Sequence, residues 1–105
     1  MPSYIIKLED HYLIWSTIVD APTAGPFTRE QLDAYMTLER GEAYMRVDHE
    51  PRMRRVEETG TSEIRASVRD TIRGNRAGPK ETELNMETLI DCYVRQPLAD
   101  AAVVG

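Results

Sequence analysis

The sequence is poor in several residue types and patterns, and each shortage excludes a class of protein. Its single cysteine, Cys92, cannot form an internal disulfide, and no cysteine or histidine pairs stand at the spacing of a zinc site. No apolar run approaches the ~18 residues that span a bilayer, and the N-terminus lacks the regions of a signal peptide. The glycine patterns of nucleotide-binding loops are missing as well. We therefore expect a cytoplasmic protein that uses no cofactor or metal and does not enter a membrane.

The composition is that of an ordinary globular chain. Hydrophobic residues make up 41% and charged residues 30% of the 105 residues. A chain of this length can bury one small core without disulfides or metals. We therefore expect a single domain over residues 1–105, too small for a multidomain enzyme.

Two apolar segments near the N-terminus predict a β-hairpin. Residues 3–8 and 12–19 are rich in β-branched and aromatic side chains, and the polar residues between them suit a short turn. Side chains of the second strand alternate between two faces: Tyr12, Ile14 and Ile18 point one way, and Leu13, Trp15 and Val19 point the other. Since both faces are apolar, helices should cover one, and a third element, a second subunit or a partner should cover the other.

Capping residues mark the predicted helices. Thr28 and Gln31 form a capping box before a helix that Gly41 can end, and Pro51 suits the first turn of a second, short helix. Asn85 can cap a last helix, which Pro97 should end. We expect helices over residues 29–40, 51–59, 63–74 or 68–74, and 86–96, with a loop over residues 20–27 and a small apolar tail over residues 98–105.

The segment 62–66 has two interpretations. Ile64, Val68 and Ile72 share a helical stripe, which starts the third helix at residue 63. Ser67 and Asp70 also form a capping box, which starts that helix at Val68 and leaves residues 62–66 free to join the hairpin as a short strand. Both versions predict an α+β fold, in which the hairpin, or a three-stranded sheet that includes it, packs against three or four short helices.

Positive charge gathers in the middle of the chain. The formal net charge is -5, yet residues 46–80 hold nine basic and six acidic residues. If residues 63–76 are helical, four arginines fall within about 80° of one another, namely Arg65, Arg69, Arg73 and Arg76, with Arg52 and Arg55 potentially nearby. Such a stripe can bind phosphates, but it also suits a solvated helix face, and a GC-rich genome alone enriches arginine over lysine.

Other candidate sites are weaker. His49 lies between Asp48 and Glu50, and His11 follows Asp10, but neither histidine has a partner at helical spacing and both fall in predicted turns. We expect both to be surface residues, and we expect no catalytic site and no thiolate nucleophile at Cys92. The run Thr59-Gly60-Thr61-Ser62 resembles a small nest for a phosphate, although helix capping explains it as well.

Several segments resemble a family of small orphan proteins encoded by actinobacteriophages. The resemblance covers about residues 4–95 and rests on four stretches: residues 12–23, 28–32, 54–62 (Arg-Arg-Val-Glu-Glu-Thr-Gly-Thr-Ser) and 75–79 (Asn-Arg-Ala-Gly-Pro). It implies a protein made in the cytoplasm of an infected GC-rich bacterium, which also suits the arginine excess. It brings no activity and no site residues, because this family has none established.

Two functional hypotheses follow. The first is a non-enzymatic interaction protein that binds a host or phage protein, as a homodimer, through Tyr12, Leu13, Trp15 and Val19. The second is an anion binder, for nucleic acid or a small nucleotide, that uses the arginines named above. An enzyme is the third option, and it would need His49, Asp48 or Glu50 to meet a group distant in the sequence.

Overall fold

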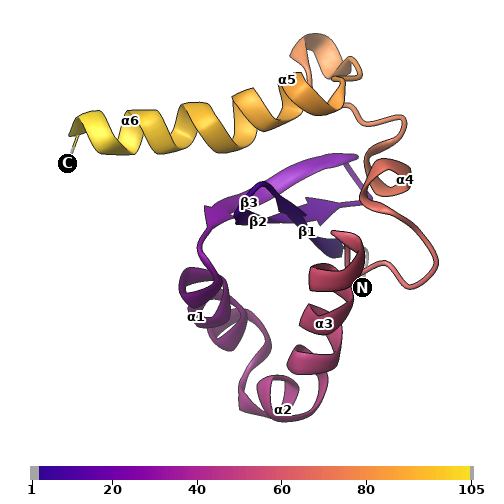
Figure 1. The fold of residues 1–105 in the computed structure, drawn as a ribbon, viewed down its shortest axis with the longest axis vertical. Coiled ribbons are helices and arrows are strands. Elements are labelled where there is room, and N and C mark those ends of the chain that lie inside the picture. The colour runs from indigo at the N-terminus through magenta and orange to yellow at the C-terminus, as the bar shows by residue number, and fades with distance from the viewer. Residues whose placement is uncertain (1–2, 105) are drawn as a thin grey trace.

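The chain forms a three-stranded antiparallel sheet followed by helices that lie on both of its faces (Figure 1). This computed structural model describes residues 3–104. The strands are β1 (Ser3–Leu8), β2 (His11–Ser16) and β3 (Ala21–Phe27), in the order β1-β2-β3. The predicted α+β class is confirmed, including the sheet of three strands.

The helical part has three sections. The first is α1 (Arg29–Arg40), and the second is a continuous helix of α2 (Glu42–Tyr44), a π-helical turn (Met45–His49) and α3 (Glu50–Thr59). After α4 (Val68–Ile72) and a 3-10 turn (Pro79–Glu81), the last section is again continuous: it consists of α5 (Met86–Ile90), a π-helical turn (Asp91–Arg95) and α6 (Gln96–Val104).

The sheet differs from the predicted hairpin in two places. The second strand ends at Ser16, so Ile18 and Val19 lie in an exposed turn. The third strand is Ala21–Phe27, where we predicted a loop because of its two prolines and one glycine. That prediction was wrong because β3 pairs with β2 only, and an edge strand tolerates prolines, which cannot donate to a neighbour. Gly25 is needed there, since a Cβ atom would lie 2.7 Å from the Tyr12 carbonyl oxygen.

Residues 60–62 lie against the outer edge of β1. The Lys7 amide donates to the Gly60 carbonyl at 2.8 Å, and the Ser62 amide donates to the Ile5 carbonyl at 2.9 Å. Only Thr61 forms a bridge with the sheet, and residues 62–66 are neither strand nor helix. Both versions of that segment were therefore wrong, but the start of the helix at Val68, with the Ser67–Asp70 capping box, is confirmed.

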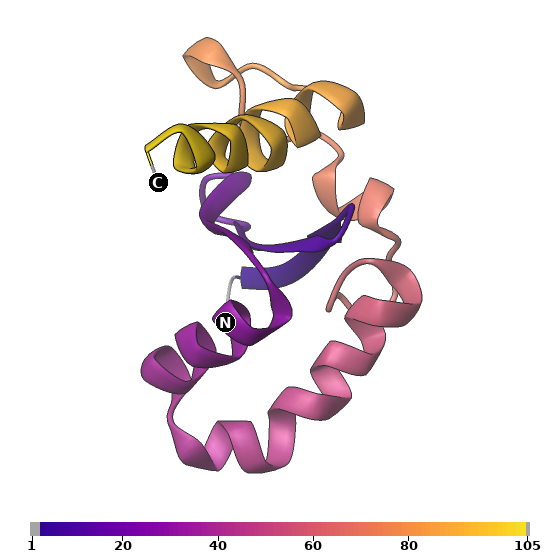
Figure 2. The same cartoon turned by 60° about the vertical axis from the view of Figure 1, so that its left-hand side comes forward.

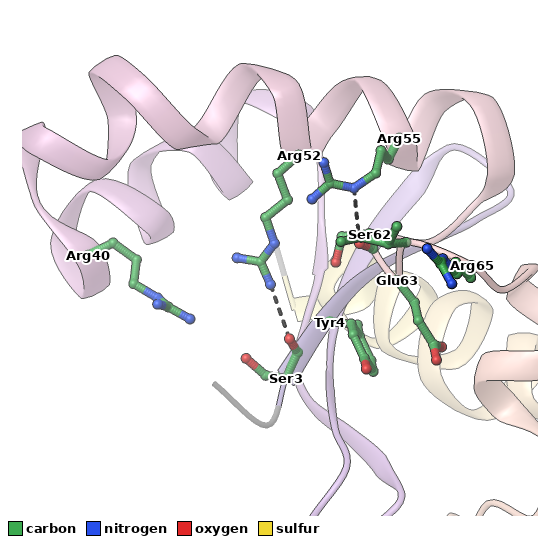
Figure 3. Close-up of a pocket in the computed structure, with 9 residues that line it drawn as sticks. Ser3, Tyr4, Arg40, Arg52, Arg55, Ser62, Glu63 and Arg65 are labelled. Carbon is green, nitrogen blue, oxygen red and sulfur yellow. Dashed lines mark hydrogen bonds between the residues drawn. The ribbon is translucent and has the colours of Figure 1, made fainter.

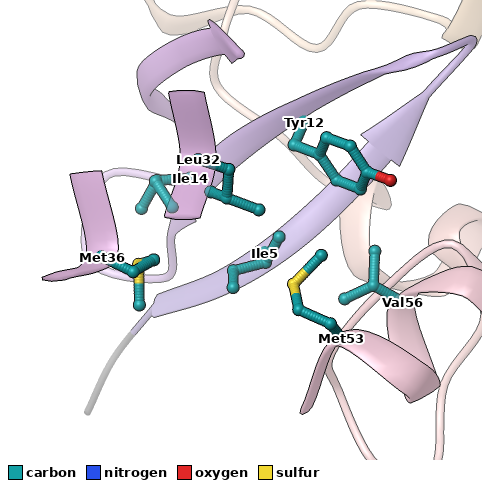
Figure 4. Packing of buried hydrophobic residues seen from close by; sticks show 7 residues of the cluster. All are labelled: Ile5, Tyr12, Ile14, Leu32, Met36, Met53 and Val56. Carbon is teal, nitrogen blue, oxygen red and sulfur yellow. The ribbon is translucent and has the colours of Figure 1, made fainter. Parts of the chain in front are cut away.

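The sheet separates two hydrophobic clusters. One face packs against α1 and α3 through a cluster shown in Figure 4, consisting of Ile5, Tyr12, Ile14, Leu32, Met36, Met53 and Val56. The other face packs against α4, α5 and the second π-helical turn, and its cluster consists of Ile6, Leu8, Leu13, Trp15, Ile72, Leu89 and Val94. Figure 2 shows the C-terminal helices on one side of the sheet and α1 to α3 on the other. The predicted alternation of residues 12–15 is confirmed, and the chain itself covers both faces.

Two prolines that we placed at helix boundaries lie inside helices. Pro51 and Pro97 each follow a π-helical turn by two residues, and the helix continues past both. In the second turn the Gln96 amide donates to the Asp91 carbonyl, five residues back. Because proline lacks an amide hydrogen and its ring crowds the carbonyl four residues before it, a widened turn at this point lets the helix go on. The predicted end at Pro97 was therefore wrong, whereas the helix predicted over residues 51–59 agrees with α3 to one residue, although α3 continues from the π-helical turn before it.

The other helix boundaries follow the capping residues. The box of Thr28 and Gln31 and the stop at Gly41 fix α1 at the predicted residues, and Asn85 caps α5. The third helix is shorter than predicted and ends at Ile72 instead of residue 74. Within residues 3–104 no helix combines the length and apolarity that crossing a bilayer requires.

Candidate functional site

The residues predicted to form an interface lie in the interior, with one exception. Trp15 and Leu13 are each 1% exposed, and Tyr12 is buried on the opposite face of the sheet. Only Val19, at 46% exposure in the turn after β2, remains at the surface. The assignment of Tyr12, Leu13 and Trp15 to an intermolecular surface is corrected accordingly, because the helices that follow in the same chain cover both sides of β2.

The predicted arginine stripe does not exist as one surface. Arg65 precedes α4, Arg73 caps its C-terminus, and Arg76 lies in the loop beyond it, so only Arg69 is inside the helix. Arg73 pairs with Asp70 at 3.1 Å. Arg76 pairs with Asp20 at 3.2 Å and also donates to the Ile18 carbonyl. Two members of the stripe are thus neutralised within the chain.

Four arginines, of which Arg65 belongs to the predicted stripe, line a surface pocket of about 700 Å³. Arg40 comes from the end of α1, Arg52 and Arg55 come from one face of α3, and Arg65 comes from the loop before α4. Figure 3 shows the guanidinium groups of Arg40, Arg52 and Arg55 extending toward the same space. The remaining wall consists of Ser3, Tyr4, Ser62, Glu63 and Ile64. Three of the predicted anion-binding residues are thus brought together, and Arg40 joins them.

None of these four arginines forms an ion pair with a carboxylate in the described part of the chain. Arg52 donates to the Ser3 carbonyl at 3.2 Å and to the Tyr44 hydroxyl at 3.3 Å, and Arg55 donates to the Ser62 carbonyl at 3.2 Å. Neutral acceptors therefore hold these two side chains in place without cancelling their charge.

Next to Arg52 lies a chain of partly buried hydrogen bonds centred on His49. His49 is 1% exposed, and its Nε2 is 2.7 Å from Asp33 Oδ1 while its Nδ1 is 3.1 Å from the Tyr44 hydroxyl. In the neutral imidazole, Nε2 donates to the carboxylate and Nδ1 accepts from the Tyr44 hydroxyl, which leaves the phenol oxygen free to accept from Arg52. The prediction that His49 is a surface turn residue was wrong, because it lies in a helix facing α1.

This arrangement resembles a catalytic triad but does not reach the pocket. The residue distant in sequence that the enzyme hypothesis demanded is Asp33, and Tyr44 completes the row. The Tyr44 hydroxyl lies behind Arg52, and Tyr44 is not one of the residues that line the pocket. The hydrogen-bonded residues Asp33, His49 and Tyr44 therefore hold Arg52 in position. Tyr44 itself would not contact a ligand in the pocket.

Sequence reasoning missed three residues of this site. Arg40 is one cation at a helix end, and nothing in its spacing connects it with Arg52. Asp33 and Tyr44 are 16 and 5 residues away from His49, too irregular for a recognised motif. Only the turn between α1 and the helix starting at Glu42 brings them together, and the sequence left residues 42–49 undecided.

The remaining candidates have structural roles. The Ser62 hydroxyl accepts from the Ile5 amide at 2.9 Å, and the Thr59 hydroxyl donates to nearby carbonyls, so the run 59–62 has no open phosphate nest. Cys92 is exposed and unpaired. In the part of the chain that is described, no three side chains of histidine, cysteine, aspartate or glutamate gather closely enough to hold a metal ion.

A separate polar cluster connects β1, β2 and α3. The Tyr12 hydroxyl donates to Glu57, and the Lys7 ammonium lies 3.0 Å from the same carboxylate. The hydrogen bond from Tyr12, followed by that from Lys7, lowers the pKa of Glu57. Burial, followed by the bond to Glu57, raises the pKa of Tyr12. This cluster fixes α3 to the sheet.

Comparison with known proteins adds no assignment, since no protein family model, no curated protein and no solved structure matches this chain.

Proposed function

We propose that this protein binds a small phosphate-bearing anion in the pocket formed by Arg40, Arg52, Arg55 and Arg65. The observation that supports it is that four arginines line one pocket and none of them forms an ion pair with a carboxylate in the described part of the chain. Like charges held close together repel one another, and a bound anion relieves that repulsion. Guanidinium groups also match the oxygens of phosphate in planar, two-pronged hydrogen bonds.

The other arginines of the chain differ from one another in their pairing. The chain has 18 acidic residues, and Arg29, Arg73, Arg76 and Arg95 all lie within 3.5 Å of carboxylate oxygens. Arg95 alone contacts three carboxylates. Arg46, Arg54 and Arg69, which lie outside the pocket, also form no ion pair among the described residues, so what distinguishes the four pocket arginines is that they line one cavity.

The pocket is also organised before any ligand arrives. Arg52 and Arg55 are one helical turn apart on α3 and are tied to backbone carbonyls. Side chains already fixed in this way lose less conformational entropy on binding. Their remaining N–H groups are available to the pocket, because each guanidinium has five donors.

A small ligand suits the whole molecule better than a long polyanion. The net charge of -5 repels nucleic acid at long range, and Arg73 and Arg76, two members of the predicted stripe, are ion-paired within the chain. The homodimer or protein partner expected to cover the sheet also loses its support, since the chain's own helices cover both faces.

Titration calorimetry with inorganic pyrophosphate at low salt tests the proposal. The double variant Arg52→Gln/Arg55→Gln should weaken binding by about 100-fold, because each charge-assisted contact contributes ~1.5 kcal/mol or more. Arg54→Gln is the matched control: it lies between them on α3, is exposed, and is not part of the pocket wall. Failure of the natural protein to bind, or an equal loss in Arg54→Gln, contradicts the proposal.

A further inference from the structure

One wall of the arginine pocket is apolar. Ile64 lines it while remaining 75% exposed, and Tyr4, which packs in part against the second hydrophobic cluster, lines the same pocket. An exposed isoleucine and a partly exposed aromatic ring in one pocket offer surface on which a flat apolar group gains burial and stacking. An inorganic anion would leave this wall uncovered.

The same pocket contains one carboxylate. Glu63 Oε2 accepts a hydrogen bond from the Thr71 hydroxyl at 2.9 Å, while Oε1 has no hydrogen-bond partner among the described residues. A free carboxylate oxygen repels a phosphate but accepts from a hydroxyl or amino group. A ligand that matches the whole pocket therefore carries hydrogen-bond donors in a part of the molecule that is separate from its phosphates.

We infer that the ligand is a free nucleotide with two or more phosphates, a refinement that rests on the proposed function. Its phosphates bind Arg40, Arg52 and Arg55, a sugar hydroxyl donates to Glu63, and the base packs on Tyr4 and Ile64. A volume of about 700 Å³ lies within the range of small-molecule sites. The acidic molecule favours a free nucleotide over a nucleic acid strand, whose further phosphates would meet the protein's net charge of -5.

The test compares ligands by titration calorimetry of the full chain: adenosine diphosphate, uridine diphosphate, pyrophosphate and a 5′-phosphorylated oligonucleotide. We expect at least one nucleoside diphosphate to bind about tenfold or more tightly than pyrophosphate. Equal affinities for both nucleoside diphosphates and pyrophosphate overturn this inference and leave the anion site intact. Tighter binding of the oligonucleotide overturns the free-nucleotide assignment. Absence of binding by all four ligands contradicts the proposed function as well.

Two variants locate the base and the sugar. Ile64→Ser should remove most of the preference for the nucleotide over pyrophosphate while leaving the affinity for pyrophosphate unchanged. Leu38 is an exposed leucine outside the pocket, so Leu38→Ser should change neither the affinity for the nucleotide nor that for pyrophosphate. Glu63→Gln should weaken binding of the nucleoside diphosphate severalfold, because the sugar hydroxyl loses a strong acceptor. The same change should strengthen binding of pyrophosphate, because a repulsive charge disappears. If Glu63→Gln strengthens both ligands equally, the assigned sugar contact is refuted.

Discussion

Leu89→Ala measures how firmly the C-terminal helices cover the sheet. Leu89 in α5 is fully buried, in the cluster that also contains Leu13 and Trp15. The change deletes three carbon groups, each contributing about 0.8 kcal/mol when buried, or roughly 2.4 kcal/mol in all. A cavity that neighbouring side chains cannot refill adds to this, so we expect a loss of about 2–5 kcal/mol. Small domains are stable by only about 5–15 kcal/mol, so the effect is large.

Urea unfolding followed by circular dichroism provides the measurement. Leu32→Ala is the matched comparison, because Leu32 is equally buried on the opposite face of the sheet. Both variants should lower the free energy of unfolding by similar amounts without changing its urea dependence, while Leu38→Ala at the surface should change it by less than about 0.5 kcal/mol. If Leu89→Ala is as mild as Leu38→Ala, the second face is not closed by this chain. Light scattering should then detect a dimer whose interface covers the sheet face that contains Trp15.

Three further changes test other parts of the fold. Tyr12→Phe should raise the pKa of Glu57, measured by NMR titration, because the hydrogen bond from Tyr12 is the main cause of its lowering. A lowered carboxyl pKa stabilises the fold above the unfolded pKa and is lost as pH falls through the folded one, so the variant should lose less stability on acidification below about pH 5. Asn75→Ala should cost about 3 kcal/mol or more in urea unfolding, since the buried amide makes four hydrogen bonds to backbone groups; a loss below 1 kcal/mol would contradict that role. Tyr44→Phe should weaken pyrophosphate binding severalfold, because Arg52 loses an acceptor, and should also lower the melting temperature by several degrees, because the buried Nδ1 of His49 loses its donor; unchanged affinity would show that the hydrogen bonds of Tyr44 do not support the pocket.

Features set by neighbours in the sequence could be predicted. The capping boxes at Thr28 and Ser67 depend on side chains three residues apart, and both appear where expected. The alternation along β2 also held, because a strand's side chains point to opposite faces whatever lies beyond them. The alternation cannot show which part of the molecule covers each face. The cover over Leu13 and Trp15, for example, includes Leu89, more than seventy positions away in the sequence.

Features set by distant contacts could not be predicted. Ala21–Phe27 has a poor local preference for strand, yet its pairing with β2 and its edge position make the two prolines acceptable. Pro51 and Pro97 are common helix breakers, but a π-helical turn before each absorbs the missing hydrogen bond. Local sequence rules give each proline its usual destabilising effect, whereas the edge position of β3 and the two π-helical turns make that effect small.

The candidate site shows the same limit in terms of charge. Arg76 fits the helical spacing of the predicted stripe, but Asp20, 56 residues earlier in the chain, neutralises it. Arg40 fits no spacing, yet it faces Arg52 and Arg55 across a pocket. An arginine is available to bind an anion when the fold places no carboxylate beside it. The positions of the acidic residues therefore matter as much as those of the arginines. Spacing along one helix therefore cannot find such a site, and several arginines that line one pocket without a carboxylate partner are the signal to look for.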